Sequence, residues 1–212
     1  MEGDTRKITI TEGLRELKLY DAKISKAIAT GNFIKAGSKA ADNINGVSKA
    51  TLENNIRADF QSVCDLIENR SLIKQKIAQS NALTKISVNG VEYTVAEAIE
   101  KKNSIAYEKR FLDRLKEAYV SNFNAMTTHN NMVEKQIDTM IMAFVSKDSD
   151  KKLSPDDLKA LSEPYRHDNE WGLLDPLDIC EKIKLLEGQI DGFESAVDTQ
   201  LSISNSITFI EV

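Results

Sequence analysis

The sequence predicts a mainly α-helical protein, in which two pseudo-symmetric helical hairpins are joined to a small four-stranded antiparallel sheet. Three observations support this fold class. The chain is rich in hydrophobic (41%) and charged (29%) residues but holds only three prolines, which is typical of long helices in a globular protein. A segment that joins a helix to a strand occurs twice. An Asn-Gly pair lies between two runs of alternating hydrophobicity, which favours a β-hairpin.

The first repeat, residues 1–89, has the pattern strand, helix, helix, strand. Thr9 and Glu12 have the spacing of a capping box, in which each side chain accepts from the backbone N–H of the other residue. A helix is therefore predicted over about 10–30. Apolar residues at spacings of three and four predict a second helix over about 49–80, packed antiparallel to the first.

The segment that ends this repeat recurs at the end of the sequence. Ser80–Val88 and Ser204–Val212 share Ser, Asn, Thr, Ile and Val at matching positions. Both copies predict a helix that stops at Ser-Asn, with Asn in a left-handed conformation, followed by an alternating strand. The alternative is a chance similarity between two helix–strand junctions.

The two repeats meet at Asn89-Gly90, between predicted strands 84–88 and 91–95. Both turn positions of a tight hairpin need positive φ, which Asn and Gly tolerate. We expect two flanking strands to pair beside this hairpin and complete the four-stranded sheet, at about 6–10 and 207–212. The second repeat is then residues 90–212, and the two repeats form one compact fold.

A very long helix opens the second repeat. Thr94 and Glu97 repeat the capping-box spacing, and the apolar pattern continues to about residue 145. The polar stretch Thr127–Asn131 is the predicted place of a bend or a break.

The chain returns through a helix predicted over about 176–204, with Asp175 as its cap and Pro176 as its first residue. A short helix that begins after Ser154 interrupts the long connection. Asp148–Lys152 begins like a calcium loop but lacks the later ligands, which favours a solvated linker.

Composition excludes several classes of function. A net charge of −5 argues against sequence-independent nucleic-acid binding, which needs a cationic face. No apolar run approaches the roughly 20 residues that span a bilayer, and the first residues lack the basic start of a signal peptide. Cys64 and Cys180 lie among apolar neighbours, so we expect reduced thiols and a cytoplasmic protein.

No catalytic motif is found. The two histidines, His129 and His167, have no helically spaced His or Cys partner, and no phosphate-binding loop or zinc motif is present. We therefore expect no enzyme, no cofactor and no metal site. The alternative is an enzyme whose site assembles from scattered carboxylates and basic residues.

Two pairs of basic residues are the candidate ligand-binding groups. Lys35 and Lys39 lie in the Gly- and Ser-containing loop Gly31–Val47, which suits a backbone nest for phosphate. Arg110 and Arg114 lie one helical turn apart and suit bidentate anion binding. The alternatives are a mobile polar loop and a salt-bridged surface helix.

Three motifs carry a resemblance to a group of proteins: Ile8–Glu12, Ser80–Val88 and Ser204–Val212. Their layout resembles uncharacterised small helical proteins encoded by phages and prophages. The resemblance implies a bacterial or viral intracellular setting, with the bacterial host cell as the location. It implies no functional residue, because the motifs are structural.

The expected function is non-enzymatic binding. A phage-encoded counter-defence protein of this type would sequester a small anionic ligand, such as a nucleotide-like signal, or a host protein. The alternative is a structural or assembly protein acting through exposed helices. We also expect a homo-oligomer, most simply a dimer, because the far end of the long helix needs cover for its apolar residues: Val133, Ile137, Ile141 and Phe144.

Overall fold

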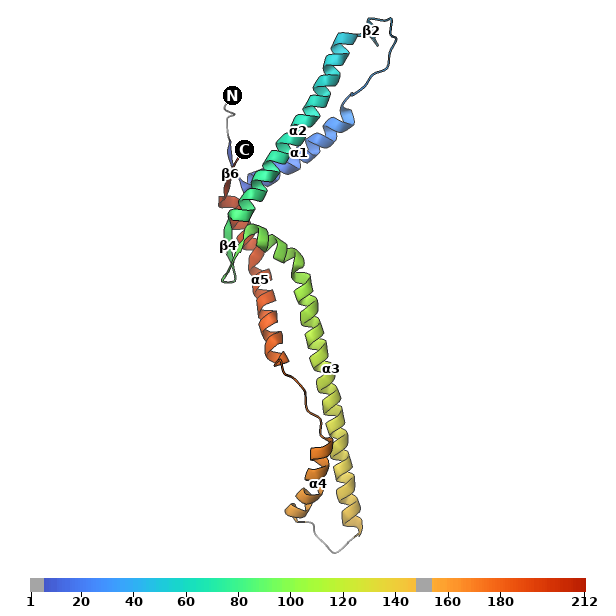
Figure 1. The fold of residues 1–212 in the computed structure, drawn as a ribbon, viewed down its shortest axis with the longest axis vertical. Coiled ribbons are helices and arrows are strands. Elements are labelled where there is room, and N and C mark those ends of the chain that lie inside the picture. The colour runs from blue at the N-terminus through green and yellow to red at the C-terminus, as the bar shows by residue number, and fades with distance from the viewer. Residues whose placement is uncertain (1–5, 148–153) are drawn as a thin grey trace. The chain divides into compact units, whose positions relative to one another are not determined.

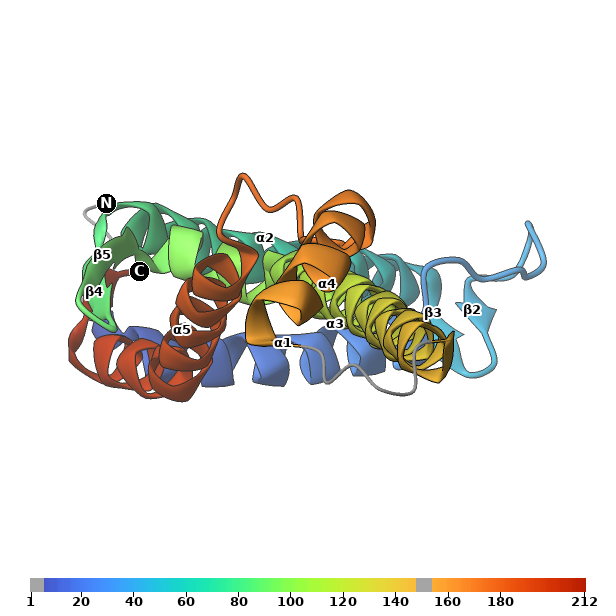
Figure 2. The ribbon, with the colours of Figure 1, turned by 90° about the horizontal axis from the view of Figure 1, so that it is seen from below.

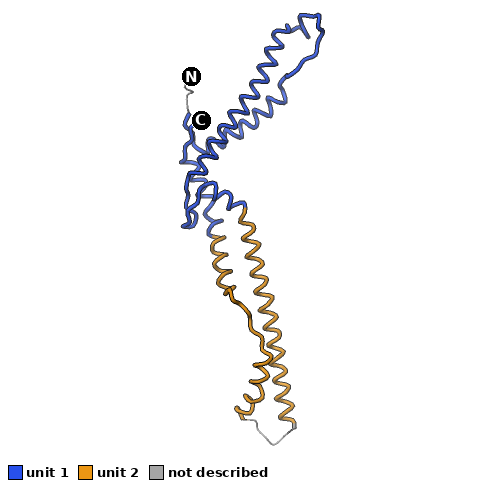
Figure 3. Tube along the Cα trace, viewed as in Figure 1, with its two compact units in different colours: residues 1–103, 192–212 blue, residues 104–191 orange. Residues whose placement is uncertain are grey.

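The computed structural model describes residues 6–147 and 154–212, so the linker residues 148–152 lie outside the described part. The chain is mainly helical, as predicted. It divides into two compact units (Figure 3): unit 1 comprises residues 1–103 and 192–212, and unit 2 comprises residues 104–191. These units differ from the two sequence repeats, because two helices each run from one unit into the other.

Unit 1 contains an antiparallel helical hairpin formed by α1 (Ile10–Thr30) and α2 (Lys49–Leu83) (Figure 1). Its strands pair in three antiparallel ladders: β1 (Lys7–Thr9) with β6 (Phe209–Glu211), β2 (Asn43–Ile44) with β3 (Val47–Ser48), and β4 (Lys85–Val88) with β5 (Val91–Thr94).

The predicted hairpin and the predicted terminal pairing are both present, but they do not join into one four-stranded sheet. In the described residues the strands form three separate two-stranded sheets. The β1–β6 and β4–β5 ladders are each followed directly by a helix, α1 after β1 and α3 after β5. The strands of these two ladders are therefore only three or four residues long.

Both predicted capping boxes form. The Thr9 N–H donates to the Glu12 carboxylate over 2.8 Å and the Thr94 N–H donates to the Glu97 carboxylate over 2.7 Å. In return, each threonine hydroxyl accepts from the backbone N–H of its glutamate. These bonds satisfy N–H groups that the first helical turn leaves without a partner, and so they fix where α1 and α3 begin.

The predicted helix stop at Ser-Asn is wrong. The structure continues α2 to Leu83 and α5 to Ile207, and neither Asn81 nor Asn205 has positive φ. A left-handed residue is unnecessary because the following threonine closes the helix. The N–H of Thr84 donates to Ser80 over 2.8 Å, and the N–H of Thr208 makes the equivalent bond to Ser204 over 3.0 Å.

The core of unit 1 lies where the ladder of β1 and β6 meets α1 and α2. Its members are buried aliphatic residues: Ile8, Ile10, Leu17, Ile73, Ile77 and Ile210. Gly13 permits the close approach, since a Cβ at this position would lie 3.2 Å from the Ile77 side chain and 3.4 Å from that of Ile210. The core therefore ties both ends of the described chain to the helical hairpin.

The loop at the far end of α1 and α2 contains a short hairpin that sequence reasoning missed. Asn45 and Gly46 have positive φ (52° and 80°) and connect β2 to β3. Figure 2 shows this hairpin beyond the ends of both helices. The signal was present, because Asn45-Gly46 is the same dipeptide that predicted the turn at Asn89-Gly90, where φ is also positive.

The long helix of unit 2 is unbroken. Helix α3 runs from Val95 to Lys147, so the bend or break expected at Thr127–Asn131 is absent. The polar side chains there serve another purpose. The Asn130 side-chain amide donates to the backbone carbonyl of Trp171 over 3.0 Å and accepts from the backbone N–H of Trp171 over 2.9 Å. The His129 ring stacks on the Trp171 ring. The polar stretch thus fastens the returning chain to α3.

The return begins with α4 (Pro155–Asn169), as the Ser154 cap predicted, and continues with α5 (Ile179–Ile207). Helix α5 starts three residues later than predicted, and Pro176 is not helical. The Asp175 carboxylate accepts from the N–H groups of Leu177 and Ile179, and Asp178 has positive φ. Asp175 therefore organises a turn that precedes the helix.

The distal apolar residues of α3 are partly covered within the chain. Val133 and Ile137 are buried, whereas Phe144 is about half exposed. Arg166 of α4 holds Glu134 of α3 by two hydrogen bonds of 2.8 Å, which fixes α4 beside this part of the helix. Part of the cover that was expected from a second chain is thus present within unit 2, whereas Phe144 still lacks it.

No helix in the described part of the chain is long and apolar enough to cross a membrane. Cys64 and Cys180 are free, half-buried cysteines that belong to different units.

Candidate ligand-binding groove

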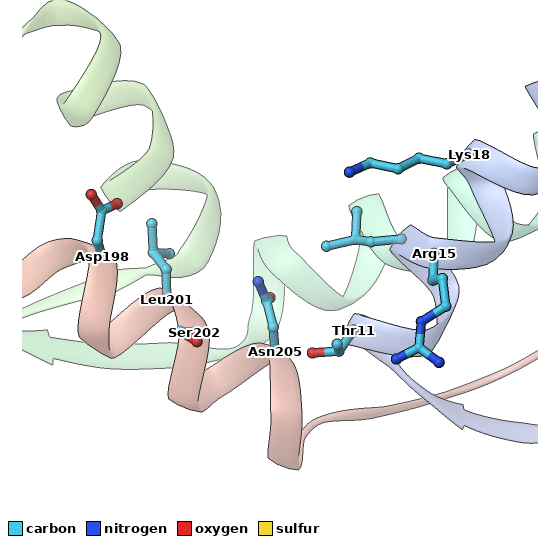
Figure 4. A pocket seen from close by; sticks show the side chains of 8 residues that line it. Thr11, Arg15, Lys18, Asp198, Leu201, Ser202 and Asn205 are labelled. Carbon is cyan, nitrogen blue, oxygen red and sulfur yellow. The ribbon is translucent and has the colours of Figure 1, made fainter.

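A groove of about 510 Å³ lies in unit 1 between α1 and the last turns of α5 (Figure 4). Four of its lining residues come from α1 and four from α5: Thr11, Leu14, Arg15 and Lys18, with Asp198, Leu201, Ser202 and Asn205.

The helical repeat explains why these side chains share one groove. On α1 they recur at spacings of three and four residues after the Thr9 cap, so they lie on one face of the helix. On α5 the same spacing places Asp198, Leu201 and Asn205 on one face. The antiparallel pairing of β1 with β6 brings the start of α1 next to the end of α5.

The groove combines apolar and polar side chains. Leu14 and Leu201 supply the apolar surface, one from each helix. In Figure 4 the Thr11 hydroxyl points toward Asn205, and the Lys18 ammonium group extends from α1 toward α5. Ligand sites in proteins commonly have this composition, with an apolar lining and a few polar groups that fix the ligand's orientation.

The groove lining carries more positive than negative charge. The Asp198 carboxylate accepts from the Lys102 ammonium over 2.5 Å. Lys102 lies outside the lining, and its positive charge compensates the negative charge of Asp198. Glu12, near Arg15, is engaged in the cap: hydrogen bonds from Thr9 lower the pKa of its carboxyl, and the Arg15 charge lowers it further. Arg15 and Lys18 are thus left as the dominant charges of the lining.

Such an arrangement suits an anion that also carries apolar surface. Arginine and lysine make charge-assisted hydrogen bonds to carboxylate and phosphate oxygens, which are stronger than neutral ones. The hydroxyls of Thr11 and Ser202 and the Asn205 amide add donors and acceptors. A volume of about 510 Å³ is large enough for a nucleotide-sized molecule.

The structure places Lys35 and Lys39 in unit 1, both exposed, in the loop after α1. Lys35 lines a second groove of about 300 Å³, but the Asp59 carboxylate lines it too. Lys39 is not among its lining residues, and the carbonyl of Lys39 accepts from Lys49 over 2.9 Å. Within the loop Gly31–Val47, positive φ occurs at Asn45 and Gly46, which form the turn between β2 and β3, and not beside Lys35 or Lys39.

Arg110 and Arg114 belong to unit 2 and are exposed on α3. Arg114 pairs with Glu117 on the same helix over 3.5 Å. Nearby, Lys116 donates to Glu187 of α5 over 2.6 Å, which raises the pKa of Lys116. This pattern is the salt-bridged helix surface that was the alternative interpretation.

The two histidines lie in unit 2. The Nε2 atom of His129 lies 2.8 Å from the carbonyl oxygen of Asn169, and His167 contacts the neighbouring Asp168. Among the residues that the structure describes, no group of three or more His, Cys, Asp and Glu side chains is arranged to hold a metal ion.

Sequence reasoning missed Arg15 and Lys18. The signal was available, because the predicted pairing of strands 6–10 and 207–212 implies that the first turns of α1 meet the last turns of α5. Asking which side chains on those turns face each other would have given Arg15, Lys18 and Asn205.

Comparisons of the chain with protein-family models, with curated proteins and with solved structures found no match.

Proposed function

We propose that this chain is a non-enzymatic binding protein that holds a small anionic ligand in the α1–α5 groove. The observation that carries the proposal is that two cations, Arg15 and Lys18, line one groove together with polar groups of α5 and two leucines. The ligand class is an anion with an apolar portion, and a nucleotide-like signal fits that description.

Binding without turnover is supported by the residue types in the groove. Its lining contains two hydroxyls, on Thr11 and Ser202, but no histidine or cysteine, and its one carboxylate, Asp198, is paired with Lys102. A serine or threonine nucleophile needs an adjacent general base, because the free hydroxyl is a weak nucleophile. The lining groups are instead those that recognise an anion and fix its orientation.

The proposal is tested with a panel of mono- and dinucleotides in an equilibrium binding assay. Arg15→Glu and Lys18→Glu should each weaken binding by at least about tenfold, because each replaces a charge-assisted hydrogen bond with repulsion. Lys26→Glu is the matched control: it makes the same charge change on α1 but lies outside the groove lining. Equal binding by all three variants would refute the groove as the site.

We also propose a cellular setting for this protein. A phage-encoded protein in the bacterial cytoplasm that removes such a signal from the host would act as a counter-defence protein. Stoichiometric capture suits that role, since a sequestered signal need not be destroyed. Infection with a phage that lacks the gene should then succeed only in hosts without the signalling defence.

Pseudo-symmetry of the two repeats is also proposed. It is supported by the matching registers of two ladders, in which Thr9 pairs with Phe209 as Thr94 pairs with Lys85. The caps and helix ends that flank the two ladders make matching hydrogen bonds. A four-stranded arrangement of the two ladders would complete the symmetry.

A structural or assembly role is the second candidate, and one observation favours it. Among the described residues, more large hydrophobic side chains are exposed than are buried. The chain exposes 15516 Å². Two separate compact domains with the sizes of the two units would together expose only roughly 12,000 Å². Co-purification with virion proteins would support this role.

A further inference from the structure

Beyond the ligand groove, unit 2 carries an apolar surface that is largely exposed among the described residues. It surrounds a groove of about 290 Å³ between α3 and α5. We call this surface the α3–α5 face and define it by its main apolar residues: Tyr107, Phe111, Leu115, Leu177, Leu185 and Leu186. Tyr107 lies one turn before Phe111, on the same side of α3.

Helix α3 has more apolar surface in this region than its own hairpin covers. Ile105 and Leu112 are buried, at 6% and 7% exposure. Phe111 lies beside Leu112 in the sequence and so about 100° around the helix, and it is 58% exposed. On α5, Ile190 is buried whereas Leu185 is 60% exposed. One helix pair covers one stripe on each helix, and a second stripe is left over on both.

We propose that a second copy of this chain packs on the α3–α5 face. Two helical hairpins that place such stripes against each other form a four-helix arrangement, which is a common way to bury two-sided hairpins. The contact would be twofold symmetric, with the same face used by both copies.

The charges around the face favour a second copy over a strongly charged partner. Lys116 pairs with Glu187 across the two helices, and Lys184 pairs with Glu181. The rim thus alternates in sign rather than presenting one charge. A strongly acidic or basic partner would meet like charges on such a rim, whereas a copy related by a twofold axis can place opposite charges together.

The available area also fits. Tyr107, Phe111, Leu177 and Leu185 are each more than half exposed. Together these four side chains expose on the order of 400 Å² of mostly apolar surface, which is about half of the roughly 800 Å² that each partner buries in a standard interface. The partly exposed Leu115 and Leu186 and the charged rim supply the rest.

Sedimentation equilibrium of the full chain between about 1 and 100 µM tests this proposal, a range that covers dissociation constants typical of weak to moderate dimers. The wild-type chain should have the mass of a dimer at the upper end. Phe111→Glu and Leu185→Glu should each lower the association constant at least about a hundredfold, because each buries an unpaired charge at the centre of the contact.

Val120→Glu is the matched control. Val120 is also an exposed apolar residue of α3, but it lies nine residues from Phe111 and so on the opposite side of the helix. This variant should dimerise like the wild type. Leu177→Gln guards against misfolding, since Leu177 precedes α5 and its replacement disturbs no helix.

Circular dichroism of each variant checks that its helical content equals that of the wild type. A wild-type monomer at 100 µM would overturn the proposal. So would a dimer that survives Phe111→Glu, Leu185→Glu and Leu177→Gln, because another surface would then hold the copies together. Loss of the dimer in Val120→Glu to the same extent would exclude this face as the specific contact.

Discussion

Thr9 and Thr94 perform the same task at the starts of two different helices. Each makes a reciprocal pair of hydrogen bonds with the glutamate three residues later, with nearly equal donor–acceptor distances. Thr9→Ala and Thr94→Ala should therefore each lower the free energy of unfolding by about 1 kcal/mol, the usual cost of losing an N-cap. Chemical denaturation followed by circular dichroism measures both, and Thr30→Ala at the end of α1 is the control.

The stability lost in each threonine variant should depend on pH, because the glutamate of each capping box carries a charge. Hydrogen bonds from Thr9 and Thr94 lower the pKa of Glu12 and Glu97 below the usual 4.5. A carboxyl with a lowered folded-state pKa stabilises the fold above its unfolded pKa and loses that effect as pH falls through the folded value. The cost of each threonine variant should accordingly shrink below about pH 4. An unchanged cost at pH 3 would contradict the assigned bonds.

Replacement of glycine by alanine should have opposite effects on stability at two positions. Gly90 has a φ of +78° in the turn between β4 and β5, where a side chain is strained, so Gly90→Ala should destabilise the chain by about 1–2 kcal/mol. Gly188 lies within α5, and a Cβ there would meet nothing within 4 Å. Gly188→Ala should therefore stabilise it by about 0.5–1 kcal/mol. Thermal unfolding of both variants checks the signs, which should differ.

At the scale of whole elements, the docking of α4 on α3 should depend on acid pH. Two hydrogen bonds from Arg166 lower the pKa of Glu134 from its usual 4.5, so the pair stabilises docking above that value and loses its effect as pH falls through the lowered pKa. Trp171, the only tryptophan, stacks on His129 beside this contact and reports on it.

The fluorescence of Trp171 should change between about pH 4.5 and pH 3 as the contact between Arg166 and Glu134 weakens. Glu134→Gln, which cannot titrate, should remove the transition in this window. A transition of equal size in that variant would mean that another group controls the docking of α4.

The sequence predicted elements that depend on local chemistry and failed where distant contacts decide. Caps at Thr9 and Ser154 and the turn at Asn89-Gly90 are determined by a few adjacent residues, and all three are present. Asn130 of α3 bonds to Trp171, forty-one residues away, and so the polar stretch alone could not reveal this contact.

The candidate site illustrates the same limit. Lys35 and Arg110 stood out because they lie in conspicuous local contexts, a glycine-containing loop and a basic helical turn. Arg15 and Lys18 have no such context. Their interest arises only when the end of α5 lies beside α1, with Lys102 compensating the one carboxylate in the lining.

In the whole molecule, the two proposed sites lie in different units. Unit 1 holds the groove lined by Arg15 and Lys18, and unit 2 holds the apolar face on which we propose that a second copy packs. These assignments rest on different residues and are tested separately. Phe111→Glu should abolish the dimer and leave each chain's α1–α5 groove intact.

Native mass spectrometry of the protein purified from cells tests whether the α1–α5 groove holds a ligand. We expect one small anionic molecule per chain in the wild-type protein and none in the Arg15→Glu, Lys18→Glu double variant, with Lys26→Glu retaining it. Mass and fragmentation identify the molecule, and incubation with an excess of it should return it unchanged. Equal retention by the double variant, or accumulation of a product beyond one equivalent, would contradict a binding protein that acts through this groove.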